Sequence, residues 1–116
     1  MEDSVCAAEL LERIDGDRSF LAELLELFRA DYPEQIRKCR EVLVNDDAMG
    51  LQRAAHGLKG ALKNLAAPAA ANLAAELEAM GKSGDTTLAI SKMMELEGEV
   101  ERVVEALEAL CMETAK

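Results

Sequence analysis

Apolar residues recur every three or four positions along most of this chain, which is the spacing of one face of an α-helix. The clearest series closes the sequence and predicts a helix over residues 86–112 with a heptad seam. An earlier series predicts a helix over residues 18–44, with a kink or a brief break near residues 30–33, because Pro33 removes one backbone hydrogen bond. The two series are Leu21, Leu25, Phe28, Tyr32, Ile36, Cys39 and Leu43, and then Ala89, Met93, Leu96, Val100, Val103, Leu107 and Leu110.

Shorter segments fill the rest of the chain. Residues 4–14 predict a first helix capped by Asp3 or Ser4, followed by a turn whose Asp17 caps the next helix. Residues 48–65 predict a third helix, for which Asn45-Asp46-Asp47 offers a cap. Pro68 is well placed in the first turn of a fourth helix. Residues 81–84 read as a turn, with Asp85 as the cap of the last helix. The inner face of the fourth helix is expected to hold Ala70, Leu73, Leu77 and Met80.

Four long amphipathic helices with short connections predict an all-α fold, an antiparallel up-down four-helix bundle whose short N-terminal helix caps one end. The length of 116 residues fits a single domain over residues 1–116. Only 3% of the residues are aromatic, and alanine, leucine and glutamate dominate the composition, which favours helices over strands.

The formal net charge of −10 argues against nucleic acid or an acidic membrane surface as a partner. The acidic N-terminus does not resemble a signal peptide, and no apolar run is long enough to span a membrane. Cys6, Cys39 and Cys111 are far apart and are expected to be small buried hydrophobes in a reducing compartment, so a cytoplasmic location is expected.

Glutamates are concentrated in the last predicted helix, mostly outside its apolar seam, where they are expected to form a solvated face. Metal binding there is not expected, because di-metal helix bundles use Glu-x-x-His motifs and this chain has a single histidine. These residues are Glu95, Glu97, Glu99, Glu101, Glu105 and Glu108.

That histidine, His56, lies in the third predicted helix. At about 100° per residue its apolar residues share one side, and His56 falls near the centre of the other. Gly60 lies beside it, although a glycine in a helix costs roughly 1 kcal/mol relative to alanine, so we expect it to clear space next to the imidazole. The apolar side holds Leu51, Ala54, Ala55, Leu58, Ala61, Leu62 and Leu65, and the polar side Gln52, Arg53, Lys59 and Lys63.

Several other chemistries lack the residues that they need. A Ser-His-Asp or Cys-His site requires a nucleophile near the base, and the helix of His56 has neither serine nor cysteine. A glycine-rich phosphate loop is absent, and zinc would need more ligands than one histidine and scattered cysteines provide.

The run His56-Gly57-Leu58-Lys59-Gly60, with Asn64 beyond it and Leu77-Glu78 late in the next helix, resembles the His-x-x-Lys-Gly signature of histidine phosphotransfer (HPt) domains. The resemblance implies that His56 is phosphorylated, that Lys59 lies beside the phosphoryl group and that Gly60 leaves room for it. It also implies that Glu78 contacts or orients the imidazole. Two positions depart from the family, since those of Lys63 and Ala66 are often a small residue and glycine.

The function implied is a relay of phosphoryl groups between receiver-domain aspartates, by a phosphocarrier with no ATP site and no autokinase activity. The expected partner is the receiver domain of a response regulator or a hybrid sensor histidine kinase, which would bring its own Mg²⁺; no cofactor is expected on this chain, and it is expected to be a monomer. Two alternatives stay open: the phospho-accepting domain of a chemotaxis-type kinase, and a non-phosphorylated bundle that only binds partners. Residues expected to support the phosphoryl group or the partner are Gln52, Arg53, Lys63 and Asn64, with apolar contact from Met49 and Ala75.

Overall fold

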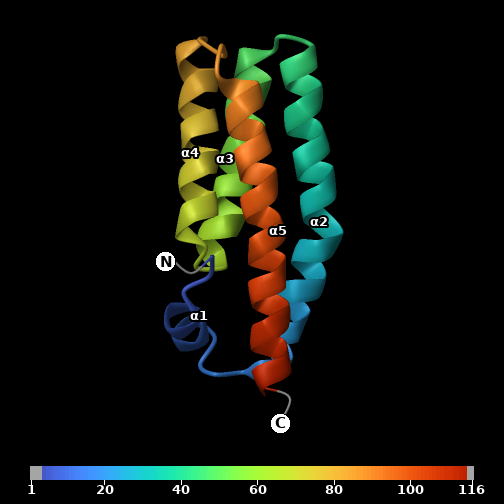
Figure 1. Cartoon of the computed structure of the whole chain (residues 1–116), viewed down its shortest axis with the longest axis vertical. Coiled ribbons are helices and arrows are strands. Elements are labelled where there is room, and N and C mark those ends of the chain that lie inside the picture. The colour runs from blue at the N-terminus through green and yellow to red at the C-terminus, as the bar shows by residue number, and fades with distance from the viewer. Residues whose placement is uncertain (1–3, 115–116) are drawn as a thin grey trace.

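The computed structural model describes residues 4–114, and all the regular structure within them is helical, which confirms the predicted all-α class. The helices are α1 (Ala7–Arg13), α2 (Arg18–Val44), α3 (Ala48–Asn64), α4 (Pro68–Ser83) and α5 (Ala89–Thr114). Figure 1 shows the long helices α2 to α5 side by side along the longest axis of the molecule, with α1 near the end where α3 meets α4.

The four long helices pack in a closed ring, in which α2 contacts α3, α3 contacts α4, α4 contacts α5 and α5 contacts α2. Their apolar stripes meet inside the ring. Every residue of the heptad seam predicted for the last helix is buried. The inner face of α4 is built from smaller residues than expected, because Leu73 and Met80 are only partly buried. The buried residues of α4 are Ala70, Ala71, Ala74, Leu77 and Gly81.

Aspartates begin two of these helices, as the sequence predicted. Asp17 Oδ1 accepts a hydrogen bond from the N–H of Phe20 at 3.0 Å, and Asp47 Oδ1 accepts one from the N–H of Gly50 at 2.8 Å. Each bond satisfies a backbone donor that has no partner within the first turn of the helix. Pro68 occupies the first turn of α4, where its missing N–H costs nothing.

The N-terminal helix begins at Ala7, later than predicted, and Ser4 does not cap it; Asp3 lies outside the described residues. Instead, the N–H of Cys6 donates to the carbonyl of Ala66 at 2.7 Å. The start of α1 is therefore set by a long-range contact with the α3–α4 connection.

Pro33 does not break α2, which is continuous over 27 residues. Of the two alternatives predicted near residues 30–33, the break is therefore wrong, and the kink stays a prediction. A proline costs its helix one backbone bond and a steric clash, but packing of one face against neighbouring helices stabilises the segments on both sides.

The turn predicted at residues 81–84 is also wrong, because α4 continues to Ser83 and only Gly84 leaves the helix, with a left-handed φ of 84°. The last helix starts at Ala89 and not at residue 86, because Asp85 Oδ1 accepts hydrogen bonds from both the N–H and the hydroxyl of Thr87 and holds a turn there.

Gly81 has a different role, which is to let α4 approach α3. A Cβ atom at this position would lie 2.5 Å from the backbone nitrogen of Gln52 and 2.7 Å from the carbonyl oxygen of Ala48. Both atoms belong to the α3 backbone, which cannot rotate out of the way as a side chain can. The missing side chain thus sets how closely these two helices pack.

Two predictions about individual side chains need correction. Only Cys39 is fully buried; Cys111 is partly buried and Cys6 is exposed. Burial, together with the nearby charge of Glu97, raises the pKa of the Cys39 thiol to about 11. Glu99 is buried rather than solvated, and its carboxylate pairs with Arg102 at 2.9 Å. No helix in the described part of the chain is long and apolar enough to cross a membrane.

Candidate functional site

The two faces of α3 differ sharply in how far they are buried. Leu51, Ala55, Leu58 and Leu62 are fully buried in the bundle, whereas the side chain of His56 is 69% exposed. The helical period alone produces this result, because His56 lies opposite the apolar stripe. The histidine is thus presented to solvent from a helix that is held firmly in the core.

One imidazole nitrogen of His56 is engaged by the neighbouring helix. The Nδ1 atom lies 2.8 Å from Glu78 Oε2, and the second carboxylate oxygen, Oε1, lies 2.6 Å from Lys59 Nζ. Glu78 comes from α4, while His56 and Lys59 lie one turn apart on α3. The carboxylate therefore bridges the imidazole and the ammonium group, and both partners restrain it.

The charges in this network determine which nitrogen of the neutral imidazole carries the proton. The hydrogen bond from Lys59, and then that from His56, lower the pKa of the Glu78 carboxyl below its usual value, so it is ionised at neutral pH. An ionised carboxylate only accepts hydrogen bonds, so we assign the proton of the neutral ring to Nδ1. The lone pair then resides on Nε2, the nitrogen that Glu78 does not contact.

The pH at which the network breaks follows from the direction of this shift. Because the folded-state pKa of Glu78 is lowered, its stabilising contribution is complete above the pKa of the unfolded chain. The contribution is lost as the pH falls through the lowered value and the carboxyl takes up a proton. The arrangement is therefore intact throughout the neutral range.

Open space adjoins the histidine on its own helix. A Cβ atom added at Gly57 or at Gly60 would meet nothing within 4 Å, so the α3 backbone is bare at both positions. Neither glycine is needed for packing within the chain. The space that they leave can admit a bulky group or the surface of a partner protein close to the imidazole.

Comparison with known protein families gives this geometry a context. The model of the Hpt domain family matches residues 23–111, which include all three members of the network. The chain belongs to the Hpt domain family. It therefore has a histidine-phosphotransfer role in phosphorelay signalling.

A solved structure of a histidine-containing phosphotransfer protein has a similar fold. This Hpt domain is similar to the crystal structure of histidine-containing phosphotransfer protein B (HptB) from Pseudomonas aeruginosa PAO1, with a TM-score of 0.79 and 26% sequence identity. The match covers 91% of this chain and 90% of the other. A search of curated protein sequences gave no match.

The remaining residues expected at the site of this Hpt domain lie around the network and not in it. Arg53 is exposed, with its guanidinium 3.5 Å from the sulfur of Met49. Lys63 is exposed two turns beyond His56, and Gln52 is half-buried beside Gly81. Asn64 lines a separate hollow between α2 and α3, together with Leu27 and Gln35. No hydrogen bond or ion pair joins these four described side chains to the imidazole.

Two residues near the site were not anticipated. Arg13 of α1 donates a hydrogen bond to the carbonyl of Lys63 at 2.5 Å and pairs with Glu9 at 2.8 Å, so it ties α1 to the end of α3. Gly81 lies one turn beyond Glu78 and fixes the spacing of the helices that carry the network. Both roles depend on contacts between distant parts of the chain, and a sequence pattern does not carry that information.

No three or more metal-binding side chains come together within the described residues of this Hpt domain. The site therefore consists of an imidazole, a carboxylate, an ammonium group and bare backbone. Such a set can hold a neutral nucleophilic imidazole and offset negative charge that arrives beside it.

Proposed function

We propose that His56 is the phosphorylated residue and that its Nε2 atom accepts a phosphoryl group from the aspartyl phosphate of a receiver domain. One observation carries the proposal: the only histidine of the chain is exposed, and its Nδ1 is bound by an ionised carboxylate. A phosphotransfer histidine must reach a partner and keep one nitrogen free, and His56 meets both needs.

The transfer step can be written in full. The Nε2 lone pair forms a bond to phosphorus, the bond between phosphorus and the aspartyl oxygen breaks, and its electron pair stays on the receiver carboxylate. The ring becomes cationic as it donates the pair, while its Nδ1 proton remains hydrogen-bonded to Glu78. The negative charge of Glu78 stabilises the developing imidazolium, as a buried aspartate does for the histidine of a catalytic triad.

Lys59 and Gly60 would assist this step in different ways. The ammonium group of Lys59 orients Glu78 and supplies positive charge within reach of the arriving phosphoryl group. Gly60 leaves the space that the group and the receiver need. Mg²⁺ would come with the receiver, and the chain itself would act as a phosphocarrier without autokinase activity.

The proposed partner is a receiver domain, belonging to a response regulator or to a hybrid sensor histidine kinase. Such a domain surrounds its aspartate with further acidic residues that bind a cation, and the exposed Arg53 and Lys63 would complement that charge. Met49, which is also exposed, would add apolar contact. One copy of the chain contains every residue of this mechanism, so a monomer would be sufficient. Receiver domains of this kind would place the chain in the cytoplasm.

We further infer a single domain over residues 1–116, folded as an antiparallel up-down bundle of α2 to α5, with α1 covering one end. The closed ring of helix contacts supports this arrangement, as does the alternating course of the chain in Figure 1. The contacts of Cys6 with Ala66 and of Arg13 with Lys63 support the place of α1.

A phosphotransfer profile tests the proposed function. The purified domain is mixed with a set of receivers phosphorylated with ³²P, and the label is followed over time. We expect rapid transfer to this chain from at least one receiver, with the acid lability of phosphohistidine. Failure of every receiver of the source organism to transfer label would contradict the proposal and favour a bundle that only binds partners.

Glu78 provides a prediction about rate. Glu78→Ala should slow transfer by about 10- to 100-fold, by analogy with the effect of removing a carboxylate that orients a metal-binding histidine. Glu78→Gln should fall between the alanine variant and the wild type, because an amide oxygen can still accept the Nδ1 proton but carries no charge. Single-turnover transfer kinetics at neutral pH measure both effects.

Glu76→Ala is the matched control for these variants, since Glu76 lies on the same helix and pairs with Lys92 on α5. It should transfer at the wild-type rate. Equal rates for Glu78→Ala and Glu76→Ala would show that the bond to Nδ1 does not contribute to transfer.

The two lysines provide a prediction about separate roles. Lys59→Ala should lower the transfer rate by about 10-fold or more, because it removes the charge next to the phosphoryl group and the partner of Glu78. Lys63→Ala should mainly raise the Kd for the receiver, and high salt should shrink that difference. Transfer kinetics and titrations at low and high salt separate the two effects.

Thermal melts of the same variants separate a structural effect from a functional one. Lys63 is exposed, and an exposed charge contributes well under about 1 kcal/mol to stability, whereas the side chain of Lys59 is only 21% exposed and is paired with Glu78. Arg37→Ala, on the opposite side of the bundle and paired only within α2, should change neither binding nor transfer. If both lysine variants lowered the melting temperature strongly and left transfer unchanged, these cations would be structural.

A further inference from the structure

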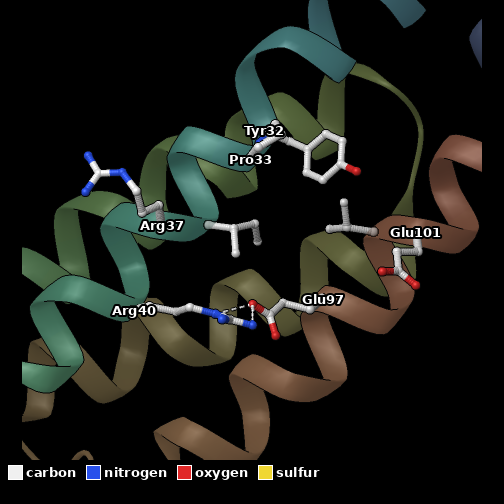
Figure 2. A pocket seen from close by; sticks show the side chains of 8 residues that line it. Tyr32, Pro33, Arg37, Arg40, Glu97 and Glu101 are labelled. Atoms are coloured by element: carbon white, nitrogen blue, oxygen red, sulfur yellow. Dashed lines mark hydrogen bonds and ion pairs between the residues drawn. The ribbon is translucent and has the colours of Figure 1, made fainter.

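A groove runs along the contact between α2 and α5, on the side of the helix ring away from His56. It consists of two hollows of about 370 and 280 Å³, both of which are lined by Arg40 and Glu97. Figure 2 shows the first hollow, where the side chains of Tyr32 and Arg40 extend from α2 toward Glu97 and Glu101 of α5. The mechanism proposed for His56 uses none of these residues.

The second hollow is markedly apolar and open to solvent. Val44 is 85% exposed, Ile90 69% and Met94 68%, and the three side chains gather from two helices around the same hollow. Single exposed apolar residues are ordinary on a protein surface, but a contiguous group beside a groove is typical of a surface that another molecule covers.

The charges along the groove are divided between its two walls. The α2 wall carries Arg29, Arg37 and Arg40, and the α5 wall carries Glu97, Glu101 and Glu108. Arg40 pairs with Glu97, and Arg29 pairs with Glu108 at 2.6 Å. Each of these arginines therefore lies at the same height along the helix axes as a glutamate across the groove. α2 thus presents a row of arginines, two of which also pair with glutamates of α2 itself, and α5 presents a row of glutamates.

We propose that this face binds a second copy of the chain, related by a two-fold axis parallel to the helices. Such a rotation places α2 of each copy over α5 of the other at the same height. Arg40 then meets Glu97 of the second copy, Glu97 meets its Arg40, and the apolar groups around Ile90 and Met94 cover each other. A two-fold axis across the helices would instead stack arginine on arginine.

A second copy fits this face better than a cationic amphipathic helix from another protein, which would meet the arginine row with like charge. The formal net charge of −10 on each copy opposes association, so the pair forms only at high concentration. Both His56 faces point outward in such a pair and remain open to receivers. The monomer expected from the sequence is then the dilute form of the protein.

Sedimentation equilibrium of the whole chain, from micromolar to millimolar concentration, tests the apolar part of the interface. The average mass of the wild type should rise toward that of two copies. Ile90→Glu combined with Met94→Glu should weaken association by at least about 10-fold. Leu27→Glu, which places the same charged side chain at an exposed apolar position on the α3 side of α2, should leave association unchanged. A wild type that stays at the mass of one copy throughout would overturn the proposal.

A charge swap tests the geometry itself. Arg40→Glu alone places four carboxylates together in the pair, and Glu97→Arg alone places four cations together, so each variant should associate at least about 10-fold more weakly than the wild type. An equal mixture of the two variants restores opposite charges at both contacts and should regain an affinity within a few-fold of the wild type. Failure of the mixture to associate better than either variant alone would overturn the two-fold arrangement. These measurements require no phosphate, so their outcome is independent of the phosphotransfer assays.

Discussion

The variant His56→Gln is expected to accept no phosphoryl group from any receiver. The chain has no second histidine, and glutamine has no lone pair on nitrogen that could attack phosphorus. Because the side chain of His56 is 69% exposed and has one bond to Glu78, its replacement should change the free energy of unfolding by no more than about 1 kcal/mol. Incubation with a ³²P-labelled receiver, beside a thermal melt, measures both quantities.

The wild type in the same incubation is the positive control. Acid-labile label on the glutamine variant would refute the assignment of the phosphorylated residue. A large loss of helicity in the variant would refute a different point, namely that His56 lies on the surface and plays no part in packing.

Gly81→Ala is expected to destabilise the domain by about 2–3 kcal/mol, the cost of forcing extra volume into a packed interface, although alanine favours a helix by about 1 kcal/mol. The added Cβ would lie within 3 Å of three α3 backbone atoms, so one helix must move away from the other. Since Glu78 lies one turn before Gly81, the same movement should draw its carboxylate away from His56 and slow phosphotransfer. Chemical denaturation and transfer kinetics of the same sample test this pair of effects.

Gly57→Ala is the matched control, because Gly57 is also inside a helix and a Cβ there would meet nothing within 4 Å. This variant should be as stable as the wild type or up to about 1 kcal/mol more stable. If Gly81→Ala were as stable as Gly57→Ala, the close approach of α3 and α4 would not depend on the glycine.

Helical periodicity accounts for what the sequence could predict. The seam of α5 and the exposed position of His56 both follow from which residues share one side of a helix, and they needed no knowledge of neighbouring helices. The aspartate caps of α2 and α3 could also be predicted from the sequence, because a cap acts within three residues of its own position.

Contacts between distant segments account for what the sequence could not predict. Gly81 resembled part of a turn because two glycines lie close together there, yet its role depends on the α3 backbone. The start of α1 depends on the carbonyl of Ala66, and the late start of α5 depends on the turn that Asp85 and Thr87 form. At the site, the resemblance implied that Glu78 contacts the imidazole. That Glu78 also bridges to Lys59 depends on how α4 packs against α3, which the sequence does not show.

Nuclear magnetic resonance of the chain labelled with ¹⁵N at histidine tests the central claim most directly. A single imidazole is present, so the two ring nitrogens can be followed before and after transfer from a phosphorylated receiver. We expect Nδ1 to carry the proton in the free domain, and phosphorus coupling to appear at Nε2 after transfer. An unchanged imidazole, or coupling at Nδ1, would contradict the account of how Glu78 leaves Nε2 as the nucleophile.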